Sequence, residues 1–81
     1  MLYLKIWDKK VNLRLKILKY IREKGEADFF KMLNDLDLAP LDLAAELKAL
    51  KDKGCIIIYE GARYSLTSEG IRELKQLEKS S

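Results

Sequence analysis

The fold is decided by residues 40–74, which read PLDLAAELKALKDKGCIIIYEGARYSLTSEGIREL. Pro40 suits the first turn of a helix because its missing N–H has no partner there, and Gly54 suits a helix end. Between these two residues, leucines recur at the spacing that lines one face of a helix. We therefore expect an amphipathic third helix that buries Leu43, Leu47 and Leu50.

A β-hairpin and a last helix are expected directly after this helix. Residues 55–60 are rich in β-branched side chains, and residues 63–66 form the returning strand. A glycine at the first central position fits a two-residue type II′ turn at residues 61–62. Thr67 or Ser68 then caps the last helix. The apolar positions of that helix are Ile71, Leu74 and Leu77.

Two further helices precede this stretch. Good helix formers run unbroken over residues 9–24, between Asp8 as an N-cap and Gly25 as a left-handed stop. Asp28 caps a second, short helix, and the chain turns at residues 36–39. Together with the third helix, these elements form a helix-turn-helix arrangement.

The N-terminal residues carry a different pattern. Apolar residues alternate with other residues over positions 2–7, which fits a short strand or the lead-in to a helix, and we expect the strand. The first helix has a wider apolar arc than one core contact requires. The excess must meet the N-terminal strand, the last helix or another subunit, and a homodimer contact through this helix is our hypothesis.

The order helix, helix, turn, helix, hairpin, helix resembles the winged helix-turn-helix domain. Two sets of residues strengthen the resemblance: the end of a recognition helix that runs into the wing, and the Y-x-L-T-x-x-G-x-x-x-L exit from the wing. The first set is Leu47, Leu50, Gly54 and Ile56, and the second is Tyr64, Leu66, Thr67, Gly70 and Leu74.

The resemblance covers the chain from about Lys10 to Leu77 and is closest in kind to small prokaryotic and archaeal transcriptional regulators of the MarR, PadR and ArsR type. It implies a single α+β domain over residues 1–81, mostly helical, with a three-helix core, a two-stranded β-hairpin wing and a C-terminal helix. It also implies that the third helix enters the DNA major groove, that the wing touches the backbone or minor groove, and that terminal helices form a homodimer.

The cations that would meet DNA lie in three places. Lys48 and Lys51 are on or beside the outer surface of the third helix, Arg63 is at the expected wing tip, and the first helix carries many more. The alternative is an ordinary solvated surface. The basic set of the first helix is Lys9, Lys10, Arg14, Lys16, Lys19, Arg22 and Lys24. The candidate DNA contacts are Lys48, Lys51, Arg63, Lys16, Lys19, Lys9 and Lys10.

The distribution of charge does not favour simple insertion of the third helix into a DNA groove. Residues 1–24 carry eight Lys or Arg and two Asp or Glu, whereas residues 25–52, the helix-turn-helix, carry three and seven. Carboxylates near phosphates are repelled. A second hypothesis is therefore a protein interaction module, for assembly or as an adaptor, that binds through an outward surface of Leu41, Asp42, Ala45, Glu46 and Ala49.

Composition excludes most other functions. With no His and one Cys in 81 residues, the chain holds no disulfide framework, no Cys/His zinc set and no imidazole base, so we expect neither an enzyme nor a cofactor. Cys55 is expected to be a buried, inert thiol. No apolar run is long enough to span a bilayer, and we expect a cytoplasmic protein. Abundant Lys and Glu suggest a thermophilic or archaeal source.

Overall fold

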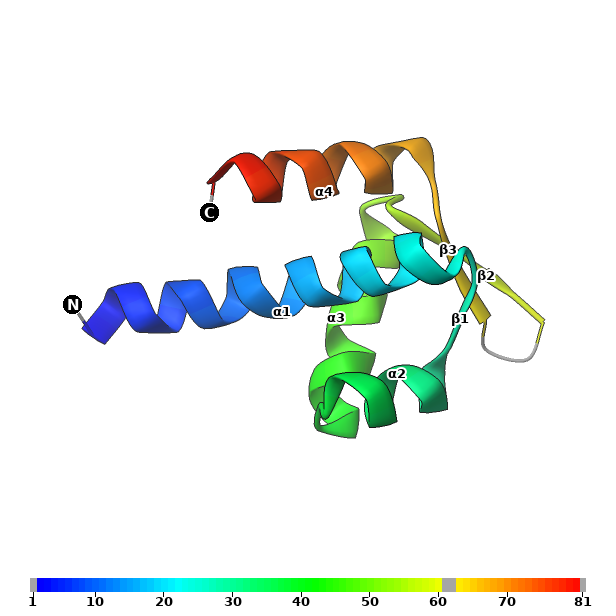
Figure 1. The fold of residues 1–81 in the computed structure, drawn as a ribbon, viewed down its shortest axis with the longest axis horizontal. Helices are drawn as coiled ribbons and strands as arrows, with labels where there is room; N and C mark the ends of the chain where they lie inside the picture. The colour runs from blue at the N-terminus through cyan, green and yellow to red at the C-terminus, as the bar shows by residue number, and fades with distance from the viewer. Residues whose placement is uncertain (1, 61–62, 81) are drawn as a thin grey trace.

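The computed structural model describes the backbone of residues 2–60 and 63–80 and the side chains of residues 12–60 and 63–79. In chain order its elements are α1 Leu2–Lys24, β1 Ala27–Asp28, α2 Phe29–Leu36, α3 Pro40–Asp52, β2 Ile56–Tyr59, β3 Arg63–Leu66 and α4 Ser68–Ser80. Helices α1 and α4 lie side by side and run in opposite directions, so both termini lie at one end of the molecule (Figure 1). The β2–β3 hairpin lies at the other end.

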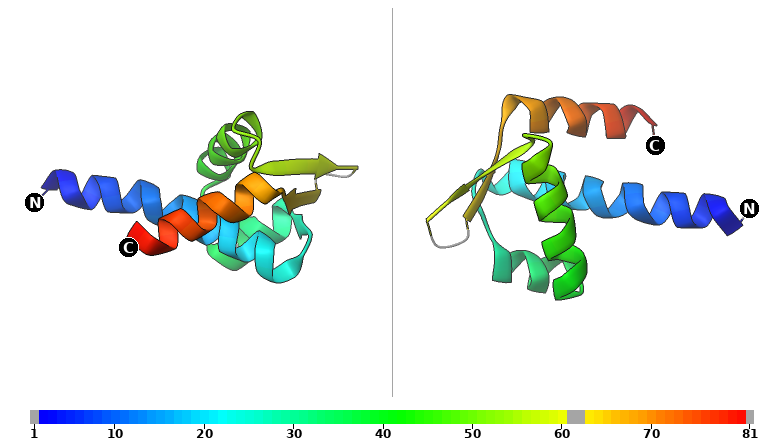
Figure 2. Two further views of the ribbon diagram at one scale, coloured as in Figure 1. Left: turned by 90° about the horizontal axis from the view of Figure 1, so that it is seen from above. Right: turned by 180° about the vertical axis from the view of Figure 1, so that it is seen from behind.

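The helix-turn-helix packs against the second half of α1. Helix α3 crosses α1 at a steep angle, and α2 lies below α1 in the view of Figure 1. The first half of α1 extends past α3 and α4, as the two further views also show (Figure 2). The body of the domain is therefore built from the second half of α1 onward.

The predicted N-terminal strand is wrong, because α1 begins at Leu2 and continues to Lys24. Asp8, which was expected to cap the helix, lies inside it. A strand needs a partner, and the three described strands pair only with one another. A growing helix, in contrast, gains one hydrogen bond with each added residue, and residues 2–24 hold neither Gly nor Pro to stop it.

The predicted hairpin is present and is widened by a third strand. β2 pairs with β3 in antiparallel register, with Ile56 opposite Leu66 and Tyr59 opposite Arg63. The two-residue β1 pairs with the other edge of β3, which gives the strand order β1-β3-β2. A strand of two residues has no periodicity to reveal it in the sequence. The turn predicted at residues 61–62 lies outside the described residues.

Several predicted helix ends are confirmed by their geometry. Asp28 accepts two backbone N–H groups from the first turn of α2, at 3.1 and 3.2 Å. Pro40 begins α3, and Gly54 follows the end of α3 with a φ of +79°, a value that favours glycine. Thr67 caps α4, since its hydroxyl accepts the N–H of Gly70 at 3.1 Å. These local signals set the lengths of α2, α3 and α4.

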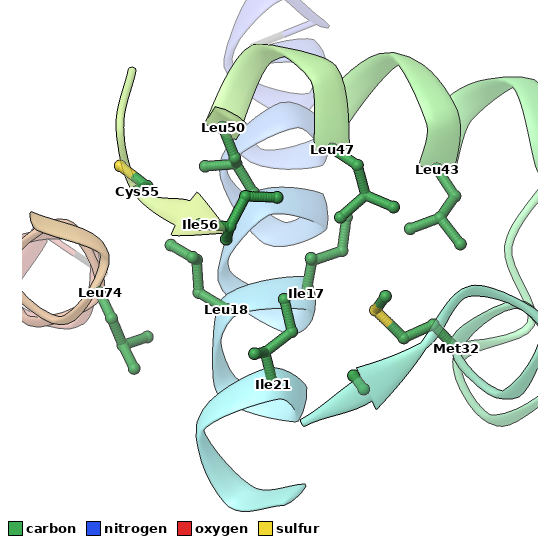
Figure 3. Close-up of a cluster of buried hydrophobic side chains, with 11 residues drawn as sticks. Ile17, Leu18, Ile21, Met32, Leu43, Leu47, Leu50, Cys55, Ile56 and Leu74 are labelled. Atoms are coloured by element: carbon green, nitrogen blue, oxygen red, sulfur yellow. The ribbon is translucent and has the colours of Figure 1, made fainter. Parts of the chain in front are cut away.

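The core lies where α1, α3, α4 and the sheet meet. The leucine face of α3 was predicted correctly, and its side chains point toward α1 (Figure 3). Removing these apolar groups from water supplies the main driving force of folding. The buried residues are Ile17, Leu18, Ile21, Ala27, Met32, Leu43, Leu47, Leu50, Cys55, Ile56 and Leu74.

Candidate nucleic-acid interface

The face of α3 that points away from the core is exposed along the helix. Leu41, Ala45, Lys48 and Asp52 follow one another at steps of four, three and four residues, and all four are exposed. They lie opposite the buried leucines, because each residue turns a helix by about 100°. A helix that packs through one face only leaves the other free to enter a groove about 12 Å wide.

Leu41 is the most exposed large apolar residue among those described, with 84% of its surface accessible. It stands in the first turn of α3, directly after Pro40. Ala44 and Ala45 are exposed beside it, and Lys48 follows one turn later. The outer face of α3 therefore offers an apolar strip that is followed by a cation, Lys48, and one turn later by a carboxylate, Asp52.

Glu46 does not belong to the outward surface on which the sequence placed it. Its side chain is only 16% exposed, and Arg14 Nε on α1 donates a hydrogen bond to Glu46 Oε2 at 2.5 Å. The expected docking surface therefore loses this carboxylate. Ala49 is half-buried, while Leu41, Asp42 and Ala45 are exposed as expected.

Arg14 is a structural cation, which corrects its place in the phosphate-binding set. Its guanidinium also lies 3.4 Å from Glu73 Oε2 on α4, and the Lys53 ammonium at the end of α3 approaches the same oxygen at 3.4 Å. Burial by itself lowers the pKa of Arg14, but the hydrogen bond and charge of Glu46, with Glu73, raise it above its ordinary value. This network, made of Glu46, Arg14, Glu73 and Lys53, joins α3 to α1 and α4.

Other carboxylates of the acidic segment also have partners within the domain. Glu26 pairs with Arg63 at 3.4 Å, and Asp28 caps α2. The Tyr20 hydroxyl donates to Asp35 Oδ2 at 2.6 Å, and this hydrogen bond raises the pKa of Tyr20 to about 12. Four of the seven carboxylates of residues 25–52 thus have partners inside the fold, whereas Asp37, Asp42 and Asp52 are exposed.

The predicted DNA contacts do not gather into one patch. Lys48 and Lys51 are exposed and lie near each other on α3. Lys19 is exposed on the side of α1 that points away from Ile17 and Ile21, and hence away from α3. Lys16 lines a groove of about 540 Å³ between α1 and α3. The side chains of Lys9 and Lys10 lie outside the described residues.

Arg63 is exposed at the start of β3, where it pairs with Glu26. Such exposed ion pairs contribute little energy and exchange readily. Beside it, the strand β2 exposes three apolar side chains that sequence reasoning treated only as strand formers: Ile57, Ile58 and Tyr59. Only the pairing of β2 with β3 at the rim of the domain shows that they are open to solvent.

Phe30 is 72% exposed at the start of α2. Its ring meets the half-buried Phe29 edge to face, with 5.5 Å between ring centres. Cys55 is buried, and burial raises the pKa of its thiol, which keeps it in the protonated, unreactive form. The expectation of a buried thiol is confirmed.

No three His, Cys, Asp or Glu side chains among the described residues lie close enough to hold a metal ion. Within those residues, no helix combines the length and the apolar composition that a bilayer crossing demands.

The three-helix core, the helix-turn-helix of α2 and α3, and the β2–β3 hairpin followed by α4 define a winged helix-turn-helix domain. This chain is similar to the solved structure of the transcriptional regulator homologue protein from Pyrococcus horikoshii OT3, with a TM-score of 0.73 and 26% sequence identity. The similarity covers 99% of this chain and 90% of that one. No protein-family model matches the chain, and neither does any curated protein sequence.

Proposed function

We propose that this chain is a transcriptional regulator that binds duplex DNA as a homodimer, with α3 in the major groove and the β2–β3 wing against the backbone. One observation carries the proposal. The outer face of α3 is exposed from Leu41 to Asp52, and Glu46, the carboxylate that would have opposed DNA most strongly near its centre, is bound by Arg14 on the inner side. The similar structure is that of a transcriptional regulator homologue.

The cations divide by their position relative to α3. Lys48 is on the outer face and would reach base edges or phosphates, while Lys51 on its flank and Arg63 on the wing would contact phosphates. Lys16 lines the groove between α1 and α3 and would contact a phosphate beside α3, whereas Lys19 points away from α3 and would contribute less. Lys9 and Lys10 remain predicted phosphate contacts.

The homodimer is supported by the shape of α1. Residues 2–7 read LYLKIW, with one charged residue among six, and the structure continues α1 through them beyond α3 and α4 (Figure 2). A helix segment of this composition is stable in water when a partner covers it. A second copy of α1 would do so, and light scattering of the chain and of Leu4→Asp tests it. The expected result is twice 9.4 kDa for the parent and a shift toward 9.4 kDa for the variant.

The test of DNA binding is a fluorescence-anisotropy titration of a labelled random-sequence duplex at low and moderate salt. Binding that weakens steeply with salt supports the proposal, because phosphate contacts release counterions. Lys51→Glu should weaken binding and reduce the salt slope by about one. Lys75→Glu on the exposed surface of α4 is the matched control, since it makes the same charge change away from α3.

The protein-docking hypothesis is the other outcome of this titration. The exposed Leu41 and Phe30 would favour it, but the loss of Glu46 from the surface removes part of its acidic character. A folded chain that does not bind the duplex at low salt would contradict the DNA proposal.

A further inference from the structure

The outer face of α3 is mostly apolar at the positions nearest its N-terminus, and the exposed carboxylate of Asp42 lies on one flank of it, where it lines the groove between α1 and α3. Leu41, Ala44 and Ala45 are exposed there, and none of them can donate or accept a hydrogen bond through its side chain. We propose that this strip recognises the 5-methyl groups of thymine in the major groove, with Leu41 as the residue that determines specificity. The inference rests on the proposed DNA-binding function and extends it to the class of sequence bound.

Thymine fits this strip for a chemical reason. Among the four bases only thymine presents a methyl group in the major groove, and apolar side chains read that group by contact. Arg, Asn and Gln read guanine and adenine by hydrogen bonds, and none of the three occurs in α3. Apart from Asp42, whose carboxylate can accept a hydrogen bond from cytosine N4, apolar contact is the means of readout that the N-terminal half of α3 has.

The geometry of α3 places the strip where reading occurs. In helix-turn-helix proteins the first residues of the recognition helix are the ones that contact base edges. Pro40 sets the start of α3, so Leu41 is its second residue. The distance from Leu41 to Lys48 along the helix is about 10 Å at a rise of 1.5 Å per residue. That length equals roughly three base-pair steps.

The alanines and Lys48 complete the strip. Small side chains at Ala44 and Ala45 let the helix backbone approach the base edges closely, and they leave Leu41 as the projecting group. Lys48 at the far end would bind guanine O6 or N7, or a phosphate. The strip therefore predicts a preference for thymine at the Leu41 end of each half-site and for guanine or a backbone contact at the other.

The same strip fits DNA better than a protein partner. Energetically dominant residues of protein interfaces are mainly Trp, Tyr and Arg, which fill pockets. Here one leucine is followed by alanines, by the exposed cations Lys48 and Lys51, and by a single exposed carboxylate, Asp52, at the end of the face. An apolar side chain that can contact a base methyl group, beside cations that can bind phosphates, matches a DNA major groove, where base edges lie between two phosphate backbones.

The experiment compares thymine with uracil, which lacks only the methyl group. A random-sequence duplex pool is enriched by repeated binding to the parent protein, and the enriched sequence is made again with uracil in place of each thymine in turn. Loss of a contacted methyl group should weaken binding about three- to fourfold. This change is the equivalent of about 0.8 kcal/mol, the free energy of burying one methylene-sized apolar group. Uracil at uncontacted positions should leave the affinity unchanged.

Two variants locate the effect. Leu41→Ala should abolish the difference between thymine and uracil and, being exposed, should leave the melting temperature almost unchanged. Ile71→Ala, an exposed apolar residue on α4, is the matched control and should keep the difference. A thymine preference that persists in Leu41→Ala would overturn the inference, because it would then arise from DNA shape or from another residue.

The remaining outcomes separate this inference from the proposed function. Enriched DNA bound equally well with thymine and uracil, or a pool in which no sequence is enriched although DNA is bound, overturns methyl recognition and leaves DNA binding standing. Absence of binding to the starting pool at low salt overturns the proposed function and this inference together.

Discussion

Glu46 and Lys48 are two residues apart on α3 and have opposite surroundings. Glu46 faces α1, where Arg14 binds it in a partly buried pair, whereas Lys48 is exposed on the outer face. Two residues turn a helix by about 200°, so neighbours in the sequence come to lie on opposite sides. The comparison teaches that the net charge of a segment does not describe the charge that a partner of that segment meets.

The largest expected difference is between substitutions on the two faces of α3, measured as the change in the free energy of unfolding. Leu47→Ala removes a buried side chain of the inner face and should lower the free energy of unfolding by about 2–5 kcal/mol, because it leaves a cavity in the core. Leu41→Ala on the outer face should change it by less than about 0.5 kcal/mol. Urea denaturation of both variants checks this, and equal losses would mean that α3 is rotated from the position described.

Breaking the ion-pair network should have the next largest effect. Arg14→Met removes the cation that pairs with both Glu46 and Glu73. Because the pairs are about three-quarters buried, we expect a loss of about 1–2 kcal/mol, between the values for exposed and fully buried pairs.

A double-mutant cycle tests whether Arg14 acts through Glu46. Adding Glu46→Gln to Arg14→Met should recover part of the lost stability, since the second change removes an unpaired charge. Strictly additive losses in thermal denaturation would show that the two side chains do not interact.

Lys48, the exposed residue in the comparison with Glu46, should affect DNA binding and not folding. Lys48→Glu should weaken duplex DNA binding several-fold, about 1 kcal/mol, while the melting temperature stays within a degree or two of the parent. Anisotropy titration beside Lys75→Glu measures the difference. If both variants bind as the parent does, Lys48 is not at the interface.

The smallest effect is expected at the contact between α1 and α2. The hydrogen bond to Asp35 raises the pKa of Tyr20 from about 10 to about 12, so the folded state holds this proton more tightly than the unfolded chain. The contribution is complete below pH 10 and is lost as the pH rises toward 12. Tyr20→Phe should therefore flatten the decline of stability over this range, measured by chemical denaturation at several pH values; an unchanged decline would contradict the role of Tyr20.

Local patterns predicted most of the fold. The leucine spacing of α3 and the ends at Asp28, Pro40, Gly54 and Thr67 were all correct, because periodicity and caps involve residues within a few positions of one another. The N-terminal strand was wrong because alternation over six residues cannot tell whether a partner strand exists. The two-residue β1 was missed for the same reason, since only its pairing with β3 defines it.

The candidate site was predictable only in part. Leu41 and Lys48 follow from the helical wheel once the buried leucines are known. The pairing of Glu46 with Arg14 does not, because Arg14 lies 32 residues earlier in the chain. The approach of Arg14 to Glu73 joins residues 59 positions apart, and no spacing in the sequence indicates it.

The sequence by itself determined the class of fold, the buried leucine face of α3 and the exposed position of Leu41 opposite it, because these depend on spacing within one element and on the order of neighbouring elements. Only the tertiary structure decided which carboxylates are paired inside the domain and which cations share a surface with α3. Those features depend on elements that are distant in the chain and meet in the folded domain. The energy of an ion pair depends on the distance between the two charges in space and not on their separation along the sequence.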